Sequence, residues 1–360
     1  MEQALELARK GTGYVNPNPL VGAVIVNEGE VVGTGYHKKY GGPHAEVFAL
    51  DEAGDRASGA EIYLTLEPCV HYGKTPPCVD RIIESGITRA IIATIDPNPR
   101  VKGKGVDKLK EAGVDVQVGL IAEEAERLNE IYFHYIRTGK PFVLLKLAQS
   151  IDGKIATRTG DSKWLSGESS LRLGHRLRSR YSAVAVGGQT VAYDDPQLTT
   201  RLVEGPDPAR IVLNSRNGVS ADAKIFDLTS PSPTIIVSTE NLGEEKRQTY
   251  RSKGAVVWEA RSSSDGHVDL KWLLGKMASD NYDSLLVEGG GELAWSFIRQ
   301  GFVDKFLFVL TPRVLGGNEA VGSVGGEGFE SVEKSLGLRD VSVSRSGPDY
   351  VYRAYPQTDQ

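Results

Sequence analysis

The chain has 360 residues, of which 40% are hydrophobic and 25% are charged, and its formal net charge is −5 at pH 7. The length predicts two domains, and the acidic balance argues against a nucleic-acid-binding protein, which would need a basic face. No signal-peptide core and no apolar run of transmembrane length are found. The sequence therefore favours a cytoplasmic protein with no membrane partner.

The first 140 residues alternate between helical and strand patterns. This alternation is typical of an α/β domain with helices packed on a mostly parallel sheet. We expect helices at residues 2–10, 44–53, 78–85, 104–112 and 121–136. We expect strands at residues 21–26, 31–37, 62–66, 90–94 and 114–119.

Both cysteines of the chain, Cys69 and Cys78, lie in one short stretch, EPCVHYGKTPPC. In a long chain without a secretion signal, such a pair indicates a metal site or a reactive thiol rather than a disulfide. Upstream, the stretch GPHAEVFAL places His44 and Glu46 in the first turn of an expected helix. Alone, His44 would be interpreted as a solvent-facing helix residue.

Together these residues predict a catalytic zinc site. His44, Cys69 and Cys78 are three ligands, the number that leaves a fourth tetrahedral position for water. Zinc lowers the pKa of that water, and Glu46 is spaced to take up its proton and return it to a leaving amine. H-x-E followed by P-C and a further cysteine is the pattern of zinc deaminases.

The cysteine spacing is wider than in the usual P-C-x-x-C pattern. A long loop can still return to the metal, because the entropy cost of closing a loop grows slowly with its length. Within this loop His71 is not expected to be a ligand, since a fourth protein ligand would close the site. Lys74 is expected to be a solvated residue, with a contact to a substrate phosphate as the alternative.

The stretch IRTGKP predicts a domain boundary near residue 140, which separates residues 1–140 from residues 141–360. The second part is expected to be another α/β domain. Its strands are expected at residues 142–148, 182–187, 210–214, 234–238, 255–260, 284–289, 305–310 and 349–355. Its helices are expected at residues 169–180, 269–279 and 292–300. The glycine-rich segment 315–329 indicates a mobile surface loop.

Two features of the second part suggest a binding site. The turn Gly289–Gly291 between a strand and a helix would let backbone N–H groups approach a phosphate, although a plain tight turn is an equal alternative. Lys146 lies in an otherwise apolar strand, where a buried lysine is rare without a partner.

The two halves resemble, in order, the two halves of the bifunctional deaminase–reductase family of riboflavin biosynthesis. The deaminase half is similar in four motifs: NPNPLVG (16–22), HAE (44–46), TLEPCVHYGKTPPC (65–78) and DPNP (96–99). The reductase half is similar in four more: KLAQSIDGKIA (146–156), GDSKWLS (160–166), AYDDPQLTTR (192–201) and VEGGGEL (287–293). The wide cysteine spacing belongs to this family's pattern. Asn16 and Val70 depart from it without removing a ligand or the carboxylate.

The resemblance implies a cytidine-deaminase-like three-layer α/β/α domain followed by a dihydrofolate-reductase-like α/β domain. It implies that residues 1–140 use Zn²⁺ to deaminate the small molecule 2,5-diamino-6-ribosylamino-4(3H)-pyrimidinone 5′-phosphate. It implies that residues 141–360 then use NADPH to reduce the ribosyl side chain to a ribityl group. Assembly as a homodimer or homotetramer is also implied.

The family's site residues carry over by motif. Cofactor contacts are expected from Ala148, Trp164, Thr190, Asp194, Ser215, Gly289, Gly290 and Gly291. Substrate contacts are expected from Asn18, Ser162, Arg178, Leu198, Arg201 and Glu288. Lys146 and Asp194 are expected to handle the proton and the ring opening, and Arg178 and Arg201 suit the 5′-phosphate because a guanidinium fork matches phosphate oxygens.

Simpler roles remain open for some of these residues. Asn18 and Asp194 could each cap a turn, Trp164 could be a core residue, and Arg178 could lie on a solvated helix face. For the whole chain, one alternative is a nucleic-acid or nucleoside zinc deaminase with an accessory binding domain. Others are a structural zinc clip beside a binding module, and activity in one half only.

Overall fold

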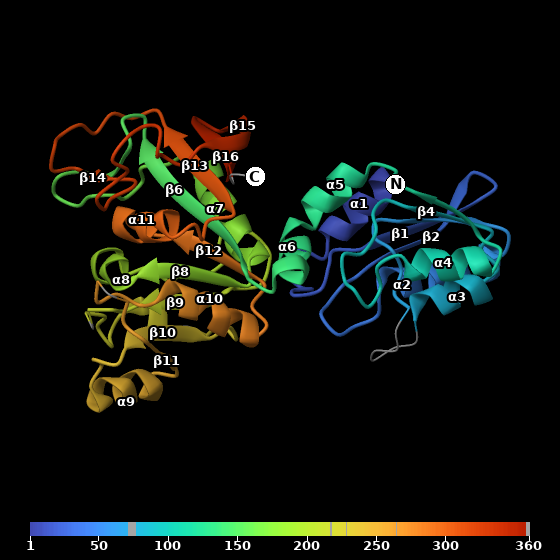
Figure 1. Ribbon diagram of the computed structural model, residues 1–360, viewed down its shortest axis with the longest axis horizontal. Coiled ribbons are helices and arrows are strands. Elements are labelled where there is room, and N and C mark those ends of the chain that lie inside the picture. Colours follow the sequence, from blue (N-terminus) through green and yellow to red (C-terminus); the bar gives the residue numbers. More distant parts are fainter. Residues whose placement is uncertain (71–76, 217, 228, 264, 358–360) are drawn as a thin grey trace. The chain divides into compact units, whose positions relative to one another are not determined.

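The computed structural model describes residues 1–70, 77–216, 218–227, 229–263 and 265–357. The chain divides into two compact units, Met1–Lys140 and Pro141–Gln360 (Figure 1). Among the described residues, no helix is both long and apolar enough to cross a lipid bilayer.

The first unit is built on a five-stranded sheet in the order β2-β1-β3-β4-β5. Its strands are β1 (Gly22–Asn27), β2 (Glu30–Tyr36), β3 (Glu61–Leu64), β4 (Arg89–Ile92) and β5 (Asp115–Val118). The strands β3, β4 and β5 are parallel, whereas β1 runs antiparallel to both of its neighbours. A tight turn at Glu28 and Gly29, which both have positive φ, joins β1 to β2 as a hairpin.

Helices cover both faces of this sheet (Figure 1). They are α1 (Glu2–Arg9), α2 (Ala45–Ala53), α3 (Cys78–Glu84), α4 (Lys104–Glu111), α5 (Ala122–Leu128) and α6 (Glu130–Thr138), with a 3₁₀ turn η1 (Gly54–Ala57). Residues of α2, α3 and α4 share one core with β1, β3 and β4. Leu5 of α1 and Ala125 of α5 pack on the opposite face. The expected three-layer α/β/α arrangement is confirmed.

One predicted helix is divided in two. The pattern over residues 121–136 predicts a single helix, but α5 ends at Leu128 and α6 begins at Glu130. Between them the side chain of Asn129 accepts a hydrogen bond from Leu20 N (2.8 Å) and donates one to Leu20 O (2.9 Å). This contact with a distant loop holds Asn129 at a non-helical φ of −99°, and local periodicity does not reveal it.

The second unit contains a nine-stranded sheet in the order β11-β10-β9-β8-β12-β6-β13-β16-β15. Its strands are β6 (Phe142–Ser150), β8 (Ala183–Gly187), β9 (Ala209–Leu213), β10 (Thr234–Thr239), β11 (Val256–Ala260), β12 (Ser284–Glu288), β13 (Lys305–Thr311), β15 (Leu338–Ser346) and β16 (Asp349–Pro356). All pairs from β11 to β13 are parallel. The pairs β13–β16 and β15–β16 are antiparallel. The carboxyl ends of seven strands therefore meet at one edge, where ligands bind in open α/β sheets.

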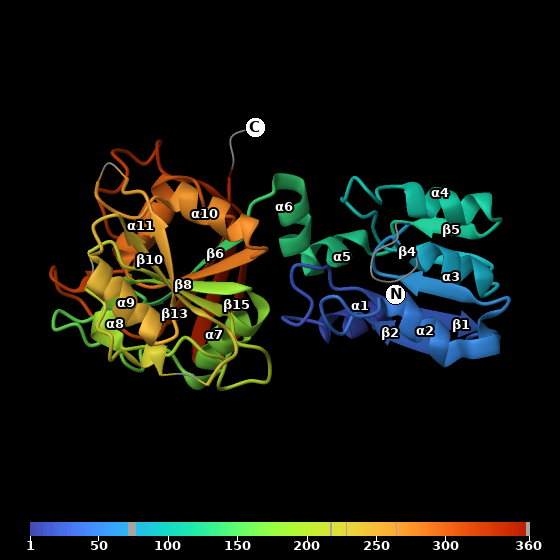
Figure 2. The same cartoon turned by 90° about the horizontal axis from the view of Figure 1, so that it is seen from below.

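The helices of this unit are α7 (Glu168–Arg180), α8 (Gly188–Asp194), α9 (Glu244–Ser252), α10 (Leu270–Ser279) and α11 (Gly291–Arg299), with a 3₁₀ turn η2 (Lys224–Phe226). Figure 2 shows α10 and α11 on one face of the sheet and α7, α8 and α9 on the other. The structure adds α8, α9 and β15 to the predicted elements. Strand β15 was missed because most of its residues are polar and exposed, so it has no buried apolar run.

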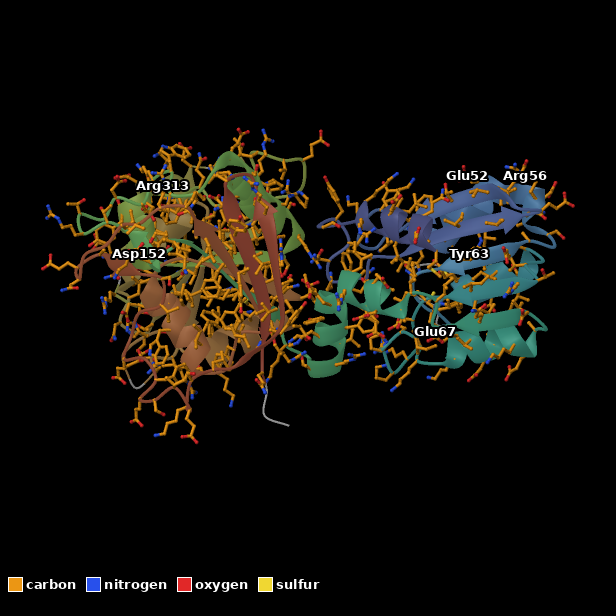
Figure 3. All side chains as sticks on the ribbon, turned by 90° about the horizontal axis from the view of Figure 1, so that it is seen from above. Glu52, Arg56, Tyr63, Glu67, Asp152 and Arg313 are labelled. Atoms are coloured by element: carbon orange, nitrogen blue, oxygen red, sulfur yellow. The ribbon has the colours of Figure 1, made fainter. Side chains whose placement is uncertain are left out.

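The glycine-rich segment 315–329 is anchored rather than loose. Its strand β14 (Val321–Gly322) pairs with β7 (Lys154–Ala156). The carboxylate of Asp152, labelled in Figure 3, accepts hydrogen bonds from Leu315 N (3.1 Å) and Gly316 N (2.7 Å). Gly325 N donates to Gly291 O (3.0 Å). The composition predicts a surface loop, but these tertiary contacts hold the segment against the start of α11.

Candidate active sites of the two units

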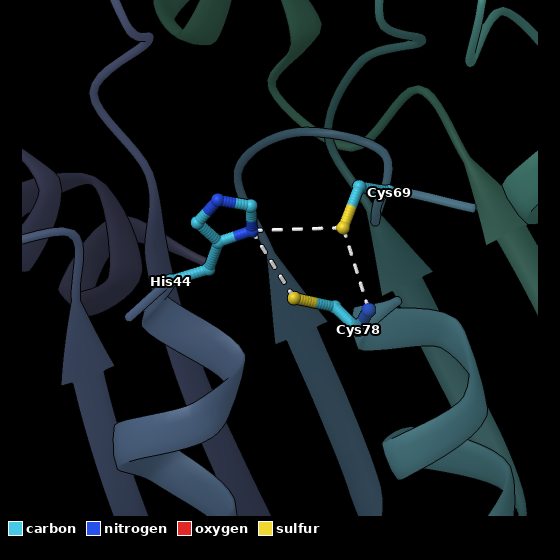
Figure 4. Close-up of side chains that lie close together, drawn as sticks. All are labelled: His44, Cys69 and Cys78. Carbon is cyan, nitrogen blue, oxygen red and sulfur yellow. Dashed lines mark hydrogen bonds between the residues drawn. The ribbon is translucent and has the colours of Figure 1, made fainter. Parts of the chain in front are cut away.

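Three side chains of the first unit converge at the amino-terminal ends of two helices (Figure 4). His44 is the N-cap residue of α2, Cys78 is the first residue of α3, and Cys69 follows β3 in the connecting loop. Nδ1 of His44 lies 3.3 Å from Sγ of Cys78 and 3.6 Å from Sγ of Cys69. The two thiols are free, so no disulfide competes for them.

These distances fit a tetrahedral zinc ion. With Zn–N near 2.0 Å and Zn–S near 2.3 Å, neighbouring ligand atoms lie about 3.5 Å apart, and the three ligand atoms lie within 4.8 Å of one another. Among the described residues, the protein donors at this point are two cysteine sulfurs and one imidazole, the number that a catalytic zinc site uses when it keeps its fourth position for water. The structure thus brings together all three residues that the sequence selects as ligands.

The two thiols differ in their environment. The Cys78 side chain and then His44 donate to Cys69, which lowers the pKa of the Cys69 thiol. The Cys78 pKa is raised, first because its thiol donates to Cys69 and then because of burial. Cys78 N also donates to Cys69 Sγ (3.3 Å), and thiolates are stabilised by such amides at a helix start.

Glu46 lies two residues after His44, in the first turn of α2. Its side chain is 3% exposed, and within the described part of the chain its Oε2 has no hydrogen-bond partner. Burial raises the pKa of this carboxyl, and the charge of His44 opposes that shift. A buried carboxylate with an uncommitted oxygen beside the zinc ligands is suited to accept and return a proton.

Asn18 is held close to this cluster by His37, a residue that the sequence analysis missed. Nδ1 of His37 lies 3.0 Å from Pro43 O, and Nε2 lies 3.1 Å from Nδ2 of Asn18. The His37 ring also packs edge-on against His44, with centroids 5.4 Å apart. Because a carbonyl oxygen only accepts, Nδ1–H is the donor and Nε2 accepts from Asn18. His71 and Lys74 lie outside the described residues.

In the second unit, Lys146 of β6 and Glu288 at the end of β12 face each other across neighbouring strands. The side chain of Glu288 is 9% exposed; its Oε1 lies 3.6 Å from Lys146 Nζ. Its Oε2 accepts from Nε (3.0 Å) and Nη2 (2.7 Å) of Arg178 on α7. Lys146 therefore has the acidic partner that its apolar surroundings require. Arg178 is not on a solvated helix face.

Burial raises the pKa of Glu288, but Arg178 and Lys146 outweigh it, so the pKa lies below its ordinary value of 4.5. Replacing Glu288 with Ala is expected to destabilise this unit by about 3–5 kcal/mol, because it leaves two largely buried cations without their anion. The stabilisation from Glu288 is present above pH 4.5 and is lost as the pH falls through the lower folded-state pKa. Tryptophan fluorescence during urea unfolding measures it selectively, because all four tryptophans lie in this unit.

The exposed i,i+4 pair of Glu168 and Arg172 provides the matched control. Glu168→Ala is expected to cost less than about 1 kcal/mol. The prediction for Glu288 would be contradicted if both variants unfolded at the same urea concentration, or if Glu288→Ala kept the wild-type loss of stability in acid.

Arg201 contacts the same cluster through His175 on α7 and through Thr199 in the segment after α8. Its Nη1 donates to Thr199 Oγ1 (2.9 Å), and its backbone N donates to Nδ1 of His175 (2.9 Å). Burial lowers the pKa of His175 to about 4, and Arg178 and Arg201 add to that shift. His175 was also missed by sequence analysis. Its position three residues before Arg178, on the same helix face, was the available signal.

Other expected residues form a second group. Asp194, the last residue of α8, accepts a hydrogen bond from Ser162 Oγ (3.2 Å). Trp164 is 75% exposed and has a φ of +62°, so the core alternative for this tryptophan is wrong. Leu198 is buried and also has a positive φ of +56°.

The glycine turn lies at the carboxyl end of β12, beside the end of β8. A Cβ at Gly289 would lie 3.5 Å from Thr190 Oγ1, whereas one at Gly290 would meet nothing within 4 Å. A Cβ at Gly291 would lie 2.7 Å from both Gly322 O and Gly325 N, so the open space that a dinucleotide phosphate would need lies at Gly290. Ala148 is half-buried in β6, and Ser215 lies just beyond β9, where its Oγ accepts from Val268 N (3.0 Å).

Family models match both units. Residues 1–94 match the cytidine and deoxycytidylate deaminase zinc-binding region, and residues 141–352 match the RibD C-terminal domain. A riboflavin biosynthesis protein RibD from Aquifex aeolicus is 45% identical over 352 residues, which cover 98% of this chain and 96% of the relative. The chain belongs to the RibD family. A RibD from Escherichia coli is 37% identical over 362 residues, with 97% and 96% covered.

Solved RibD structures share the whole architecture. The first of two Acinetobacter baumannii RibD forms has a TM-score of 0.88 at 34% identity and covers 99% of this chain and 98% of its own. A Thermotoga maritima structure, described as a diaminohydroxyphosphoribosylaminopyrimidine deaminase/5-amino-6-(5-phosphoribosylamino)uracil reductase, has a TM-score of 0.85 at 36% identity. It covers 99% of this chain and 97% of its own.

The chain is therefore a bifunctional deaminase and reductase of riboflavin biosynthesis that uses Zn²⁺ and NADPH. The expected fold of both halves is confirmed by RibD structures that cover nearly all of it. The alternative of a nucleic-acid deaminase with an accessory domain is set aside, because RibD relatives match both halves in order.

Proposed function

We propose that residues 1–140 carry out the deamination and residues 141–360 the reduction. The observation that carries this assignment is the separation of two sets of groups. His44, Cys69, Cys78 and Glu46 lie in the first unit, and the Lys146–Glu288–Arg178 cluster and the glycine turn lie in the second. The substrate we assign is 2,5-diamino-6-ribosylamino-4(3H)-pyrimidinone 5′-phosphate, the small molecule that the RibD family implies.

In the deaminase unit the chain positions the substrate and moves one proton. His44, Cys69 and Cys78 would hold a zinc ion, which would supply the chemistry of lowering the pKa of a bound water molecule. Oε2 of Glu46 accepts the proton and returns it to the 2-amino group, which leaves as ammonia. Asn18 donates to His37 through Nδ2, so we assign its Oδ1 to the substrate ring or ribose.

In the reductase unit the chain orients the opened ribose. NADPH supplies a hydride for C1′. Lys146 and Asp194 handle the proton and the ring opening, and Lys146 Nζ lies 3.6 Å from Oε1 of Glu288. Arg201 uses one of its five N–H donors on Thr199, so we assign it the 5′-phosphate. Arg178 commits three N–H donors to Glu288 and Thr199, which makes it the weaker phosphate ligand of the two.

The remaining substrate contacts of this unit are Ser162, Leu198 and Glu288. The NADPH contacts are assigned to Ala148, Trp164, Thr190, Asp194, Ser215 and the turn Gly289–Gly291. What supports them is their placement near the carboxyl ends of the parallel strands and around α8.

A two-step assay on the purified protein tests this division. Ammonia release from the diaminopyrimidine ribotide is expected to require zinc but not NADPH. NADPH oxidation is expected only after deamination, and to continue with pre-deaminated substrate after zinc is removed by a chelator. Loss of both activities on chelation, or NADPH oxidation with the undeaminated ribotide, would contradict the assignment of one reaction to each unit.

We also propose that the protein is a cytoplasmic homo-oligomer. Strand β15 is the outer strand of the nine-stranded sheet, and Val341 and Val343 on it are 51% and 58% exposed. Tyr350 of β16 is also 51% exposed. An edge strand with exposed apolar residues favours pairing with another chain. Light scattering distinguishes the dimer and the tetramer from a monomer.

A further inference from the structure

Glu67 is a buried acidic residue that the zinc chemistry does not use. It lies between β3 and Cys69, in the motif TLEPC, and is 3% exposed. Its Oε1 accepts hydrogen bonds from Gly105 N (2.8 Å) and Val106 N (3.2 Å). Its Oε2 accepts from Gly103 N (3.0 Å) and Asp96 N (3.2 Å). One carboxylate thus satisfies four backbone N–H groups.

These donors belong to the start of α4 and the loop before it. The first N–H groups of a helix have no partner within the helix, and here a side chain from another segment accepts two of them. The contact is close, because a Cβ at Gly105 would lie 2.4 Å from Pro68 O and 3.1 Å from Cγ of Glu67. The backbone around Pro68 is therefore pressed against the start of α4.

The same short segment is held from its other side by α3. Cys69 Sγ accepts from Cys78 N (3.3 Å), and Cys69 O accepts from Val79 N (3.3 Å). Residues 67–69 thus connect the starts of two helices. The carboxylate of Glu67 accepts hydrogen bonds from α4, and the thiol of Cys69 accepts one from α3.

The hydrogen bonds of Glu67 extend to the motif DPNP at residues 96–99, to which the deaminase chemistry assigns no role. Asp96 gives its N–H to Glu67, and its carboxylate accepts from Asn98 N (2.8 Å) and the Tyr132 hydroxyl (3.0 and 3.2 Å). Tyr132 lies on α6. The loop 96–106 is therefore held in place from both ends.

We propose that Glu67 is a positioning residue that fixes Sγ of Cys69 in the geometry that zinc requires. Because Pro68 allows little backbone freedom, a displacement of the Glu67 carboxylate is expected to move Cys69, the zinc ligand that follows it. This proposal rests on the assignment of Cys69 as a zinc ligand. Residues that orient metal ligands typically change metal affinity or activity by about 10–100-fold when they are replaced.

The substitution Glu67→Gln is a sharp test, because it keeps the shape and removes one acceptor. Whichever way the amide is turned, its NH₂ group faces two backbone N–H donors, either Gly105 and Val106 or Gly103 and Asp96. Two buried donors then lose their acceptor. The matched control is Glu52→Gln, since Oε2 of Glu52 also accepts a backbone N–H, from Thr34 (2.7 Å), and Figure 3 shows it well away from Glu67.

Two measurements on the full-length protein separate positioning from general stability. The first is the rate of zinc loss to a chelator, which is expected to rise about 10–100-fold in Glu67→Gln and to stay unchanged in Glu52→Gln. The second is the absorption spectrum after Co²⁺ replaces Zn²⁺, in which the thiolate-to-cobalt bands are expected to shift. NADPH oxidation with pre-deaminated substrate is expected to match the wild type. Wild-type zinc loss and a wild-type cobalt spectrum in Glu67→Gln would overturn the proposal.

A second variant covers the case in which Glu67→Gln does not fold. Gly105→Ala pushes on Pro68 from the helix side and is also expected to speed zinc loss; an unchanged rate would overturn the proposal. Cys69→Ser tests the assignment of Cys69 as a zinc ligand separately from the positioning role of Glu67. If that variant kept zinc as tightly as the wild type, the ligand assignment and this proposal would fall together. If only the Glu67 and Gly105 variants matched the wild type, the positioning role alone would fall.

Discussion

Glu46→Gln is expected to lower the rate of ammonia release by about 10²–10⁴-fold, the usual contribution of a general acid–base group, while one zinc ion stays bound. The amide keeps the size of the side chain but cannot accept a proton at the buried Oε2 position. The ligand atoms of His44, Cys69 and Cys78 are untouched, so metal content measured by elemental analysis is expected to equal that of the wild type.

The control for this variant is Glu52→Gln, which changes an exposed carboxylate on the same helix. It is expected to keep full deaminase activity. If Glu46→Gln lost its zinc, Glu46 would hold the metal site together rather than transfer a proton. If it kept both zinc and activity, another group would be the proton carrier.

Lys146→Met and Asp194→Asn are each expected to lower NADPH oxidation by about 10²–10⁴-fold and to leave ammonia release unchanged. The physical reason for Lys146 is its position in an apolar strand, where it pairs with the buried Glu288 carboxylate beside the expected substrate site. For Asp194 the reason is its exposed position on α8, with Ser162 Oγ as its hydrogen-bond partner. Stopped-flow absorbance of NADPH with pre-deaminated substrate measures both.

The exposed pair of Lys276 and Asp280 on α10 supplies matched controls. Lys276→Met and Asp280→Asn make the same chemical changes away from the cluster and are expected to have no effect on turnover. Wild-type NADPH oxidation in both Lys146→Met and Asp194→Asn would reject their catalytic assignment, whereas loss in only one would reject the assignment of the other alone.

Local patterns predicted most of the parallel strands because apolar runs such as those of β6 and β12 are buried on both faces. They failed where a distant contact overrides the pattern. Asn129 divides one expected helix because its side chain bonds the backbone of Leu20. The segment 315–329 is rich in glycine, yet Asp152 and Gly291 hold it against the rest of the unit.

The candidate sites likewise contain some residues that local sequence patterns identify and others that only distant contacts reveal. The zinc ligands and Glu46 could be selected from residue type and spacing, since only a few residue types bind zinc and only two cysteines are present. His37 and Glu67 could not be selected in this way, and for His175 the available signal was its place on the helix face of Arg178. Each of the three forms hydrogen bonds with groups elsewhere in the chain, and no short sequence motif encodes those partners.

By itself, the sequence determined the chemistry available to this protein: one imidazole, two thiols and a carboxylate in the first half, and a lysine in an apolar strand before a glycine turn in the second. Only the tertiary structure decided which of these groups meet, which acid pairs with Lys146, and what holds Cys69 in place. The physical reason is that side-chain type and spacing are local properties. Contacts such as those of Glu67 and Glu288 depend on the order in which strands and helices pack, which is set by interactions along the whole chain.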